Sequence, residues 1–200
     1  LDDSWVGLSL TMPLKTAVLP LLASSSDLVR ATGSANTVLL PARHGENTDV
    51  AGMLAALAEV GLTQAARVVV LGSGATARSA LAAAAALGCA RPTVVARSTP
   101  AVPLDAEVVA WSPEVLDGCD LLISTLPARA ADAFAAHVGD VPALLDVVYD
   151  PWPTALAQAC RGVVASGAAM LLHQAAAQVT LMTGQAAPVD AMRGALKPAR

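Results

Sequence analysis

The sequence predicts an α/β protein in which a doubly wound parallel sheet is joined to part of a smaller α/β lobe. Three observations predict this fold: short strands alternate with helices after Arg67, a glycine-rich turn follows the first of these strands, and the elements before Arg67 follow a different order. The composition suits helices packed closely on a sheet, because 55% of the residues are hydrophobic but only 2% are aromatic. The core must therefore consist mainly of Ala, Val and Leu.

The first sixty residues are interpreted as the C-terminal part of the smaller lobe. Alternating apolar runs predict strands, and longer periodic runs that end at glycine predict helices. In chain order these are a strand over 5–10, helices over 14–22 and 26–31, a strand over 37–40 and a helix over 49–60. The last of these helices leads directly into the larger lobe.

Residues 61–166 are interpreted as the sheet domain. Short β-branched runs predict buried parallel strands, at 67–72, 93–97, 107–111, 120–125, 144–149 and 162–165, with an Ala-rich helix at 75–87. Residues 167–200 form a C-terminal segment whose helix over 168–182 is long enough to return to the first lobe.

Several classes of protein are excluded by the charge and the cysteines. A formal net charge of -4 argues against binding nucleic acid through phosphate neutralisation, and no run of about eighteen apolar residues indicates a membrane span. The three cysteines lie far apart, and neither they nor the histidines are spaced as ligands of a metal. We therefore expect a cytoplasmic protein without a metal site. No secretory signal is recognised, and because the sequence opens at Leu1 without Met, we expect an upstream segment.

The turn after the strand over 67–72 has the pattern GxGxxA, and its residues are Gly72, Ser73, Gly74, Ala75, Thr76 and Ala77. The first glycine permits a tight turn, the second lets the backbone approach a pyrophosphate, and the helix that follows offers free N–H groups to the phosphates. The alternative is a purely structural turn. Its place between a strand and a helix favours a Rossmann dinucleotide site.

Arg97 and Ser98 end the second strand of the sheet domain, where an NAD enzyme usually has Asp or Glu. A guanidinium followed by hydroxyls suits a 2′-phosphate instead, so NADP is expected. The alternative is a solvated arginine at a strand end.

Three polar clusters lie within the first lobe: Lys15 follows a short apolar motif, Asn36 belongs to the run 33–37, and Asp49 to the run 47–49. Lysine can exchange a proton when it is partly buried. Each cluster alone has an ordinary explanation, as a lysine at a helix start, a turn or an N-cap. Their occurrence together beside a dinucleotide domain favours a reaction centre.

These clusters, together with the glycine turn and the runs 146–151 and 167–174, resemble the ordered motifs of shikimate dehydrogenases over nearly the whole chain. The resemblance implies NADPH-dependent reduction of 3-dehydroshikimate to shikimate, in the biosynthesis of aromatic amino acids. It assigns Lys15 and Asp49 to catalysis at the reacting oxygen. It assigns substrate contacts to Thr11, Asn36, Tyr149 and Gln174, and cofactor contacts to Asp27, Val147 and Gly167, beside the glycine turn and the strand end.

The chain departs from the family in two respects. Ala96 replaces an asparagine that usually precedes the arginine, and the family has an upstream segment with serines that hold the substrate carboxylate. Without that segment we expect NADP binding but weak shikimate binding. Three alternatives stay open: a quinate/shikimate dehydrogenase of broader specificity, a non-catalytic dinucleotide-binding module, and a folate-linked dehydrogenase, whose usual Tyr-xxx-Lys is absent. A homodimer is one assembly that the sequence leaves open.

Overall fold

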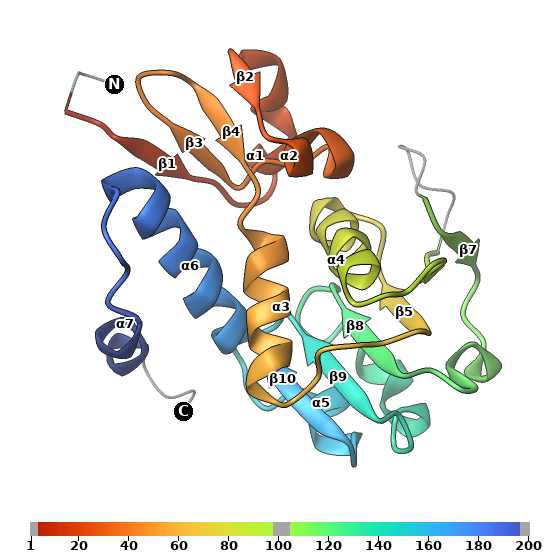
Figure 1. The fold of residues 1–200 in the computed structure, drawn as a ribbon. Helices are drawn as coiled ribbons and strands as arrows, with labels where there is room; N and C mark the ends of the chain where they lie inside the picture. The colour runs from red at the N-terminus through yellow and green to blue at the C-terminus, as the bar shows by residue number, and fades with distance from the viewer. Residues whose placement is uncertain (1–3, 98–104, 197–200) are drawn as a thin grey trace.

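The computed structural model of the chain describes residues 4–97 and 105–196. It contains two separate sheets, one of four strands in the order β1-β3-β4-β2 and one of six in the order β10-β9-β8-β5-β6-β7. Two long helices run side by side from the smaller sheet to the larger one (Figure 1). The predicted α/β fold is confirmed.

The smaller lobe holds short elements: β1 (Gly7–Ser9), α1 (Leu14–Ala17), the 3₁₀ helix η1 (Leu19–Leu21), β2 (Ser24–Ser25), α2 (Asp27–Thr32), β3 (Thr37–Leu39) and β4 (His44–Glu46). β3 pairs antiparallel with both β1 and β4, while β2 pairs parallel with β4. Ser26 caps α2 by accepting a hydrogen bond from the Val29 N–H, and Gly33 ends it in the left-handed conformation.

The larger lobe has six strands, all parallel. Its elements are β5 (Val68–Leu71), α4 (Ala75–Ala86), β6 (Thr93–Val95), β7 (Glu107–Val109), η2 (Pro113–Leu116), β8 (Leu121–Ser124), η3 (Asp132–His137), β9 (Ala143–Asp146), α5 (Ala155–Ala159) and β10 (Val163–Ser166). The strand order reverses between β5 and β8. In such sheets ligands bind beyond the carboxyl ends of the strands at this reversal.

The two lobes are joined by α3 (Asp49–Glu59) and α6 (Gly167–Thr183), and α7 (Val189–Ala195) packs against α6. α3 and α6 approach closely at Gly52, because a Cβ atom there would lie 2.8 Å from the Gln174 Cβ and from the Met170 carbonyl oxygen. α3 also packs against α4. The helix that begins at Asp49 therefore contacts the helix that follows the glycine turn.

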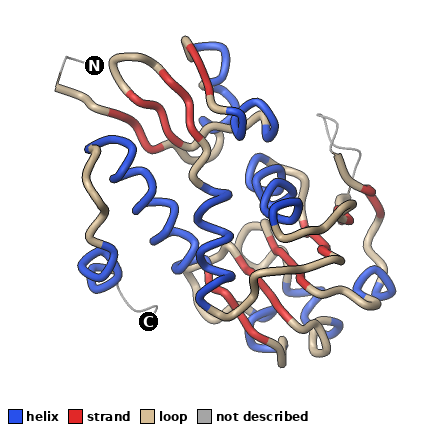
Figure 2. The backbone as a smooth tube through the Cα atoms, in the orientation of Figure 1, coloured by secondary structure: helices blue, strands red, loops and turns tan. Residues whose placement is uncertain are grey.

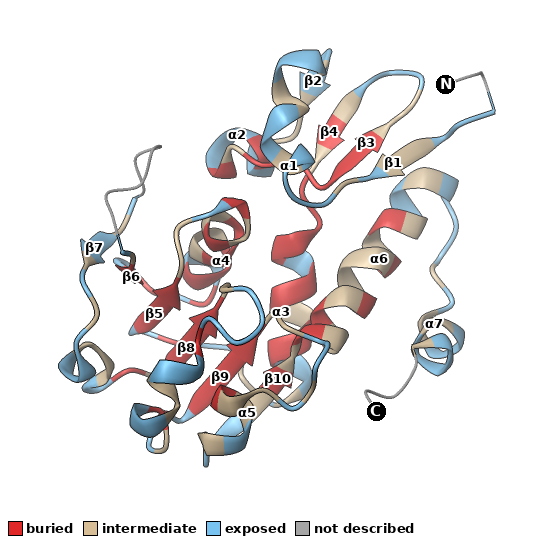
Figure 3. Cartoon of the chain, turned by 180° about the vertical axis from the view of Figure 1, so that it is seen from behind, coloured by how far each residue is buried: buried red, intermediate tan, exposed pale blue. Residues whose placement is uncertain are grey.

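The core lies on both faces of the larger sheet. Val68 and Val70 of β5 point to the face covered by α3 and α4, whereas Val69 and Leu71 point to the face covered by α5 and η3. The central strands β5, β8 and β9 and the inner side of α3 are buried, while β7, α7 and the first helices are largely exposed (Figure 3). Small alanines on α4 face the sheet and allow the helix to pack closely on it.

Most predicted elements are present within a few residues of the expected bounds, as the alternation of helices and strands in Figure 2 shows. The helix expected over 14–22 is instead split into α1 and η1, because Pro20 lies in the first turn of the second piece. The strand expected over 144–149 ends at Asp146, whose carboxylate accepts hydrogen bonds from the Val148 N–H at 3.2 Å and from the Thr154 hydroxyl at 2.7 Å. The short elements β2, β4, α5 and α7 were not predicted.

Candidate active site

Lys15 and Asp49 form an ion pair between two segments of the smaller lobe. The Lys15 Nζ lies 2.6 Å from the Asp49 Oδ2, and the two side chains are 12% and 3% exposed. Residues 35 and 36 connect the two segments through backbone hydrogen bonds. The Ala35 N–H donates to the Lys15 carbonyl at 2.8 Å, and the Asn36 N–H donates to the Glu46 carbonyl at 3.1 Å. Asp49 is the first residue of α3, where the helix dipole favours a carboxylate.

Asn36 connects this pair to α6. Its Nδ2 lies 3.0 Å from the Asp49 Oδ1, 3.0 Å from the Gln174 Oε1 and 2.8 Å from the Thr48 Oγ1. Asn36 is buried, so these bonds compensate for its loss of water. The result is a polar network made from residues of three separate parts of the chain.

A cavity of about 360 Å³ lies between the lobes, and we call it the interlobe cavity. Its lining from the smaller lobe includes Thr11, Lys15 and Asp49. The larger lobe and α6 contribute Thr76, Val147, Tyr149, Gly167 and Gln174, together with Met170 and Leu171. The structure therefore places eight of the predicted site residues around one cavity, and Asn36 contacts two of them.

A second cavity of about 510 Å³ lies beside the glycine turn, and we call it the glycine-turn cavity. Gly72, Ser73 and Arg97 are among the residues that line it. The remaining lining is largely apolar: Leu71, Val95, Ala96, Ala110, Trp111, Leu126, Pro127, Ala130 and Phe134. The Trp111 and Phe134 rings meet edge to face with their centroids 4.3 Å apart, which gives the cavity a firm aromatic wall.

The glycine turn and the helix after it contribute to both cavities, since Gly72 and Ser73 line the glycine-turn cavity and Thr76 lines the interlobe cavity. Gly72 has a φ of +106°, and a Cβ there would lie 2.6 Å from the Thr125 Oγ1, so only glycine fits. Gly74 precedes α4 without a side-chain cap, and a Cβ there would meet nothing within 4 Å. The start of α4, with Ala75 and Thr76, is thus open to an anion such as a pyrophosphate.

Asp146 anchors the turn that carries Val147 and Tyr149. Burial raises the pKa of the Asp146 carboxyl above its ordinary value, while the hydrogen bonds from Thr154 and Val148 act in the opposite direction. Gly167 follows at the start of α6, and a Cβ there would lie 2.2 Å from the Val147 carbonyl oxygen. This close contact holds α6 against the end of β9.

Three described residues that were predicted to contact the cofactor line neither cavity: Asp27, Gly74 and Ala75. Asp27 is exposed, forms an ion pair with Arg30 on its own helix and lines neither cavity. Ser98 lies outside the described residues. Gly74 and Ala75 lie at the start of α4 rather than in the lining of either cavity.

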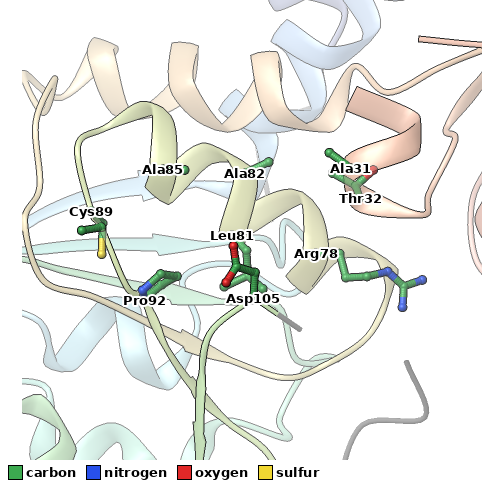
Figure 4. A pocket seen from close by; sticks show the side chains of 10 residues that line it. Ala31, Thr32, Arg78, Leu81, Ala82, Ala85, Cys89, Pro92 and Asp105 are labelled. Atoms are coloured by element: carbon green, nitrogen blue, oxygen red, sulfur yellow. The ribbon is translucent and has the colours of Figure 1, made fainter. Parts of the chain in front are cut away.

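A smaller cavity of about 200 Å³ lies along the outer face of α4, opposite α2 (Figure 4). Its lining includes Arg78, Cys89 and Asp105 and none of the predicted site residues. The Arg78 guanidinium donates to the Gly33 carbonyl at 3.3 Å and so ties α4 to α2. Burial lowers the pKa of Arg78.

Sequence reasoning missed several polar residues of the network. Thr48 and Gln178 were not singled out, although both are buried polar residues beside the site. Asn47 was recognised as part of the cluster 47–49, with a cap as its ordinary explanation. In the structure its Nδ2 reaches the Ser79 Oγ on α4 at 3.0 Å, while its Oδ1 accepts from the Asp49 N–H. Gln178 could have been found as a second glutamine one helical turn after Gln174.

Two findings bear on other kinds of site. In the described part of the chain, no group of three or more His, Cys, Asp or Glu side chains is placed to hold a metal ion. Within residues 4–97 and 105–196, no helix has the length and apolar character needed to cross a membrane.

Comparison with known proteins gives consistent relatives. The profile of the shikimate 5′-dehydrogenase C-terminal domain matches residues 167–197. The NADP(+) shikimate dehydrogenase of Thermosynechococcus vestitus is 35% identical over 97% of this chain and 77% of that protein. The crystal structure of Mycobacterium tuberculosis shikimate dehydrogenase superposes with a TM-score of 0.88 at 38% identity, covering 98% of this chain and 81% of the other. The Thermus thermophilus shikimate 5-dehydrogenase, solved in complex with NADP(H) and shikimate, has a TM-score of 0.82 at 26% identity, covering 96% and 78%.

Proposed function

The chain belongs to the shikimate dehydrogenase family, and from this membership we infer that it is an NADP-dependent oxidoreductase that interconverts 3-dehydroshikimate and shikimate. This reaction contributes to the biosynthesis of aromatic amino acids. The observation that carries the assignment within this chain is the Lys15–Asp49 ion pair, which lines a cavity that also reaches the glycine-turn helix at Thr76. We assign the roles of individual residues as follows.

Lys15 is proposed to donate a proton to the C3 oxygen of 3-dehydroshikimate, where negative charge develops during reduction. Asp49 keeps the ammonium group in place through its Oδ2 and binds the neighbouring hydroxyl of the substrate. The pair therefore holds a proton at the position where the reaction needs it.

The substrate ring is proposed to contact Thr11, Asn36, Tyr149 and Gln174. Thr11 and Tyr149 are exposed at the edge of the interlobe cavity, whereas Asn36 is buried beneath it. A polyol needs such paired donors and acceptors, because an unpaired buried polar group costs about 1–3 kcal/mol. We therefore propose that a small polyhydroxylated molecule binds in the interlobe cavity.

The residues present fit NADP. Gly72, Ser73, Gly74, Ala75 and Thr76 form an uncapped helix start that suits the pyrophosphate, and the apolar glycine-turn cavity suits the adenosine. Arg97, with Ser98 beside it in sequence, is proposed to hold the 2′-phosphate. Val147 and Gly167 line the interlobe cavity and are proposed to contact the nicotinamide. When bound, NADPH supplies the hydride.

Two alternatives differ in what they require. A quinate dehydrogenase using NAD needs an acidic residue after β6, where this chain has Arg97. A non-catalytic dinucleotide-binding module needs the glycine turn but not the Lys15–Asp49 pair. We therefore favour the NADP-dependent enzyme, and we propose a cytoplasmic homodimer.

We also propose a division of the chain into a catalytic lobe over 1–60, a cofactor domain over 61–166 and returning helices over 167–200. The packing of α3 against α4 supports rigid attachment of the first part to the second.

The test is NADPH oxidation by 3-dehydroshikimate in the purified protein and in Lys15→Ala. We expect Lys15→Ala to lower kcat by about 100-fold or more, the range for loss of a general acid, while the Kd of NADPH stays near that of the wild type. Lys15→Arg keeps the charge but does not release a proton readily, so it should be nearly as inactive. Retained turnover in both variants would refute the role of Lys15.

A further inference from the structure

Gln178 is a buried glutamine on α6 that takes no part in the proposed contacts with substrate or cofactor. It is 6% exposed, and it is not among the described residues that line the interlobe cavity. Its Nε2 lies 3.1 Å from the Asn36 carbonyl oxygen and 2.9 Å from the Thr37 Oγ1. Because a carbonyl oxygen can only accept, the amide nitrogen of Gln178 must face this side.

The contact with Thr37 has a direction. The Thr37 hydroxyl accepts a hydrogen bond from Gln178, so its single hydrogen is free to be donated to the Asn36 Oδ1 at 2.9 Å. The same Oδ1 accepts from the Thr48 N–H at 2.8 Å, and that group can only donate. Both bonds orient the Asn36 amide with its oxygen away from the ion pair.

The consequence appears at Asp49. With its oxygen held in this way, Asn36 presents its Nδ2 to the Asp49 Oδ1 at 3.0 Å. The other carboxylate oxygen receives the Lys15 ammonium at 2.6 Å. Each oxygen of the buried carboxylate therefore has its own donor, and the one from Asn36 depends on how its amide is turned.

An ordinary structural role does not account for Gln178. The Asn36 carbonyl oxygen already accepts from the Leu10 N–H at 2.7 Å, so it has a partner without Gln178. The additional hydrogen bond from the Gln178 amide makes the Thr37 oxygen an acceptor and leaves the Thr37 hydrogen to be donated to the Asn36 Oδ1. A chain of donors thus runs from α6 through β3 to the start of α3.

We propose that Gln178 is a positioning residue that acts through Thr37 and Asn36 to fix the Asp49 carboxylate beside Lys15. This rests on the proposed function, in which Asp49 and Lys15 act on the substrate. This relay of Gln178, Thr37 and Asn36 links α6 to the reacting groups, and Gln178 itself touches neither substrate nor cofactor.

The main variant is Gln178→Glu, which keeps the length of the side chain and removes its donors once ionised. The Thr37 hydroxyl then donates to the introduced carboxylate, and Asn36 loses one of the two bonds that orient it. We expect kcat to fall about 10- to 100-fold, as is usual when a hydrogen-bonded partner of a reacting group is lost, with an unchanged KM for NADPH. The loss should shrink as the pH falls, because a protonated carboxyl group can again donate.

Three further variants separate the relay from packing. Gln158→Glu introduces the same charge at an exposed glutamine on α5 and should behave as the wild type. Thr37→Val should lower kcat, and Thr37→Ser should restore it. If Gln178→Glu and Thr37→Val keep the wild-type kcat throughout the pH range, the proposal is overturned.

A second measurement does not depend on activity. The side-chain NH₂ resonances of Asn36, assigned with Asn36→Ala, should shift in Gln178→Glu and Thr37→Val but not in Gln158→Glu. A wild type that shows these shifts but does not turn over 3-dehydroshikimate even at saturating concentrations would refute the proposed function and keep the relay. Unmoved resonances would refute the relay.

Discussion

We propose that the Arg97 side chain selects NADP over NAD. It follows β6, is exposed, and lines the glycine-turn cavity. A guanidinium can bind a phosphate through two charge-assisted hydrogen bonds, which together contribute about 2 kcal/mol or more. We expect Arg97→Ala to weaken NADPH binding about 30-fold while leaving NADH binding nearly unchanged.

The measurement is the Kd of each nucleotide by fluorescence titration. Arg91→Ala is the matched control, because Arg91 is an exposed arginine just before the same strand. Equal losses for NADPH and NADH in Arg97→Ala would contradict recognition of a 2′-phosphate.

Single residues also show how far the sequence could predict the site. Lys15 and Asp49 were recognised from local motifs, and the structure pairs them. The orientation of the Asn36 amide could not be predicted from the sequence, because it depends on partners as distant as Gln174, which lies 138 positions along the chain. Asp27 matched a family position by sequence, but it pairs with Arg30 instead of reaching a cavity.

The pair of helices α3 and α6 depends on a close approach at Gly52. A Cβ there would lie 2.8 Å from the Gln174 Cβ, which leaves no room for alanine without movement of α6. We expect Gly52→Ala to lower the free energy of unfolding by about 1–3 kcal/mol, despite the better helix propensity of alanine. Because Gln174 lies at the contact, the KM for 3-dehydroshikimate should rise as well.

Urea denaturation measures this effect, and Gly194→Ala provides the control. Gly194 lies in α7, and a Cβ there meets nothing within 4 Å. That substitution should be neutral or stabilising by about 0.5–1 kcal/mol. A Gly52→Ala protein as stable as Gly194→Ala would show that the helices do not meet at this point.

Elements were predictable where the periodicity was long. The Ala-rich helix over 75–87 and the β-branched strands gave clear patterns, and α4 and the parallel strands lie where they were expected. β2 and β4 have two and three residues, so neither is long enough to show an alternating pattern. Their pairing is fixed by hydrogen bonds between strands rather than by local preference.

The arrangement of the whole molecule follows from helices that cross from one lobe to the other. The alternation of strands and helices predicted the doubly wound sheet, and the long last helix predicted a return to the first lobe. No local pattern predicted the polar bonds between lobes, such as Asn47 to Ser79 on α4 or Gln178 to the Asn36 carbonyl just before β3. These bonds join α4 and α6 to the smaller lobe.

Glu59 fastens the C-terminal helices to the far end of α3. Its carboxylate is paired with Arg193 of α7 and lies 2.8 Å from the His173 Nε2 on α6. The hydrogen bond from Arg193 lowers the pKa of Glu59 below its ordinary value of 4.5, with a smaller contribution from His173 and against the effect of burial. A lowered pKa means that the ionised form stabilises the fold above the unfolded pKa, and that this stability is lost as the pH falls through the folded pKa.

We expect Glu59→Gln to lower the free energy of unfolding at neutral pH. The loss should be less than about 1 kcal/mol, because the Glu59–Arg193 pair is partly exposed. The difference from the wild type should shrink below about pH 4.5 and vanish once Glu59 is protonated in the folded protein. Thermal melts of the wild type, Glu59→Gln, Arg193→Met and the double variant across this range provide the measurement. In the Arg193→Met background the effect of Glu59→Gln should be smaller, since its main partner is gone. A difference that stays constant with pH would mean that the Glu59 carboxylate does not hold α7 to α3.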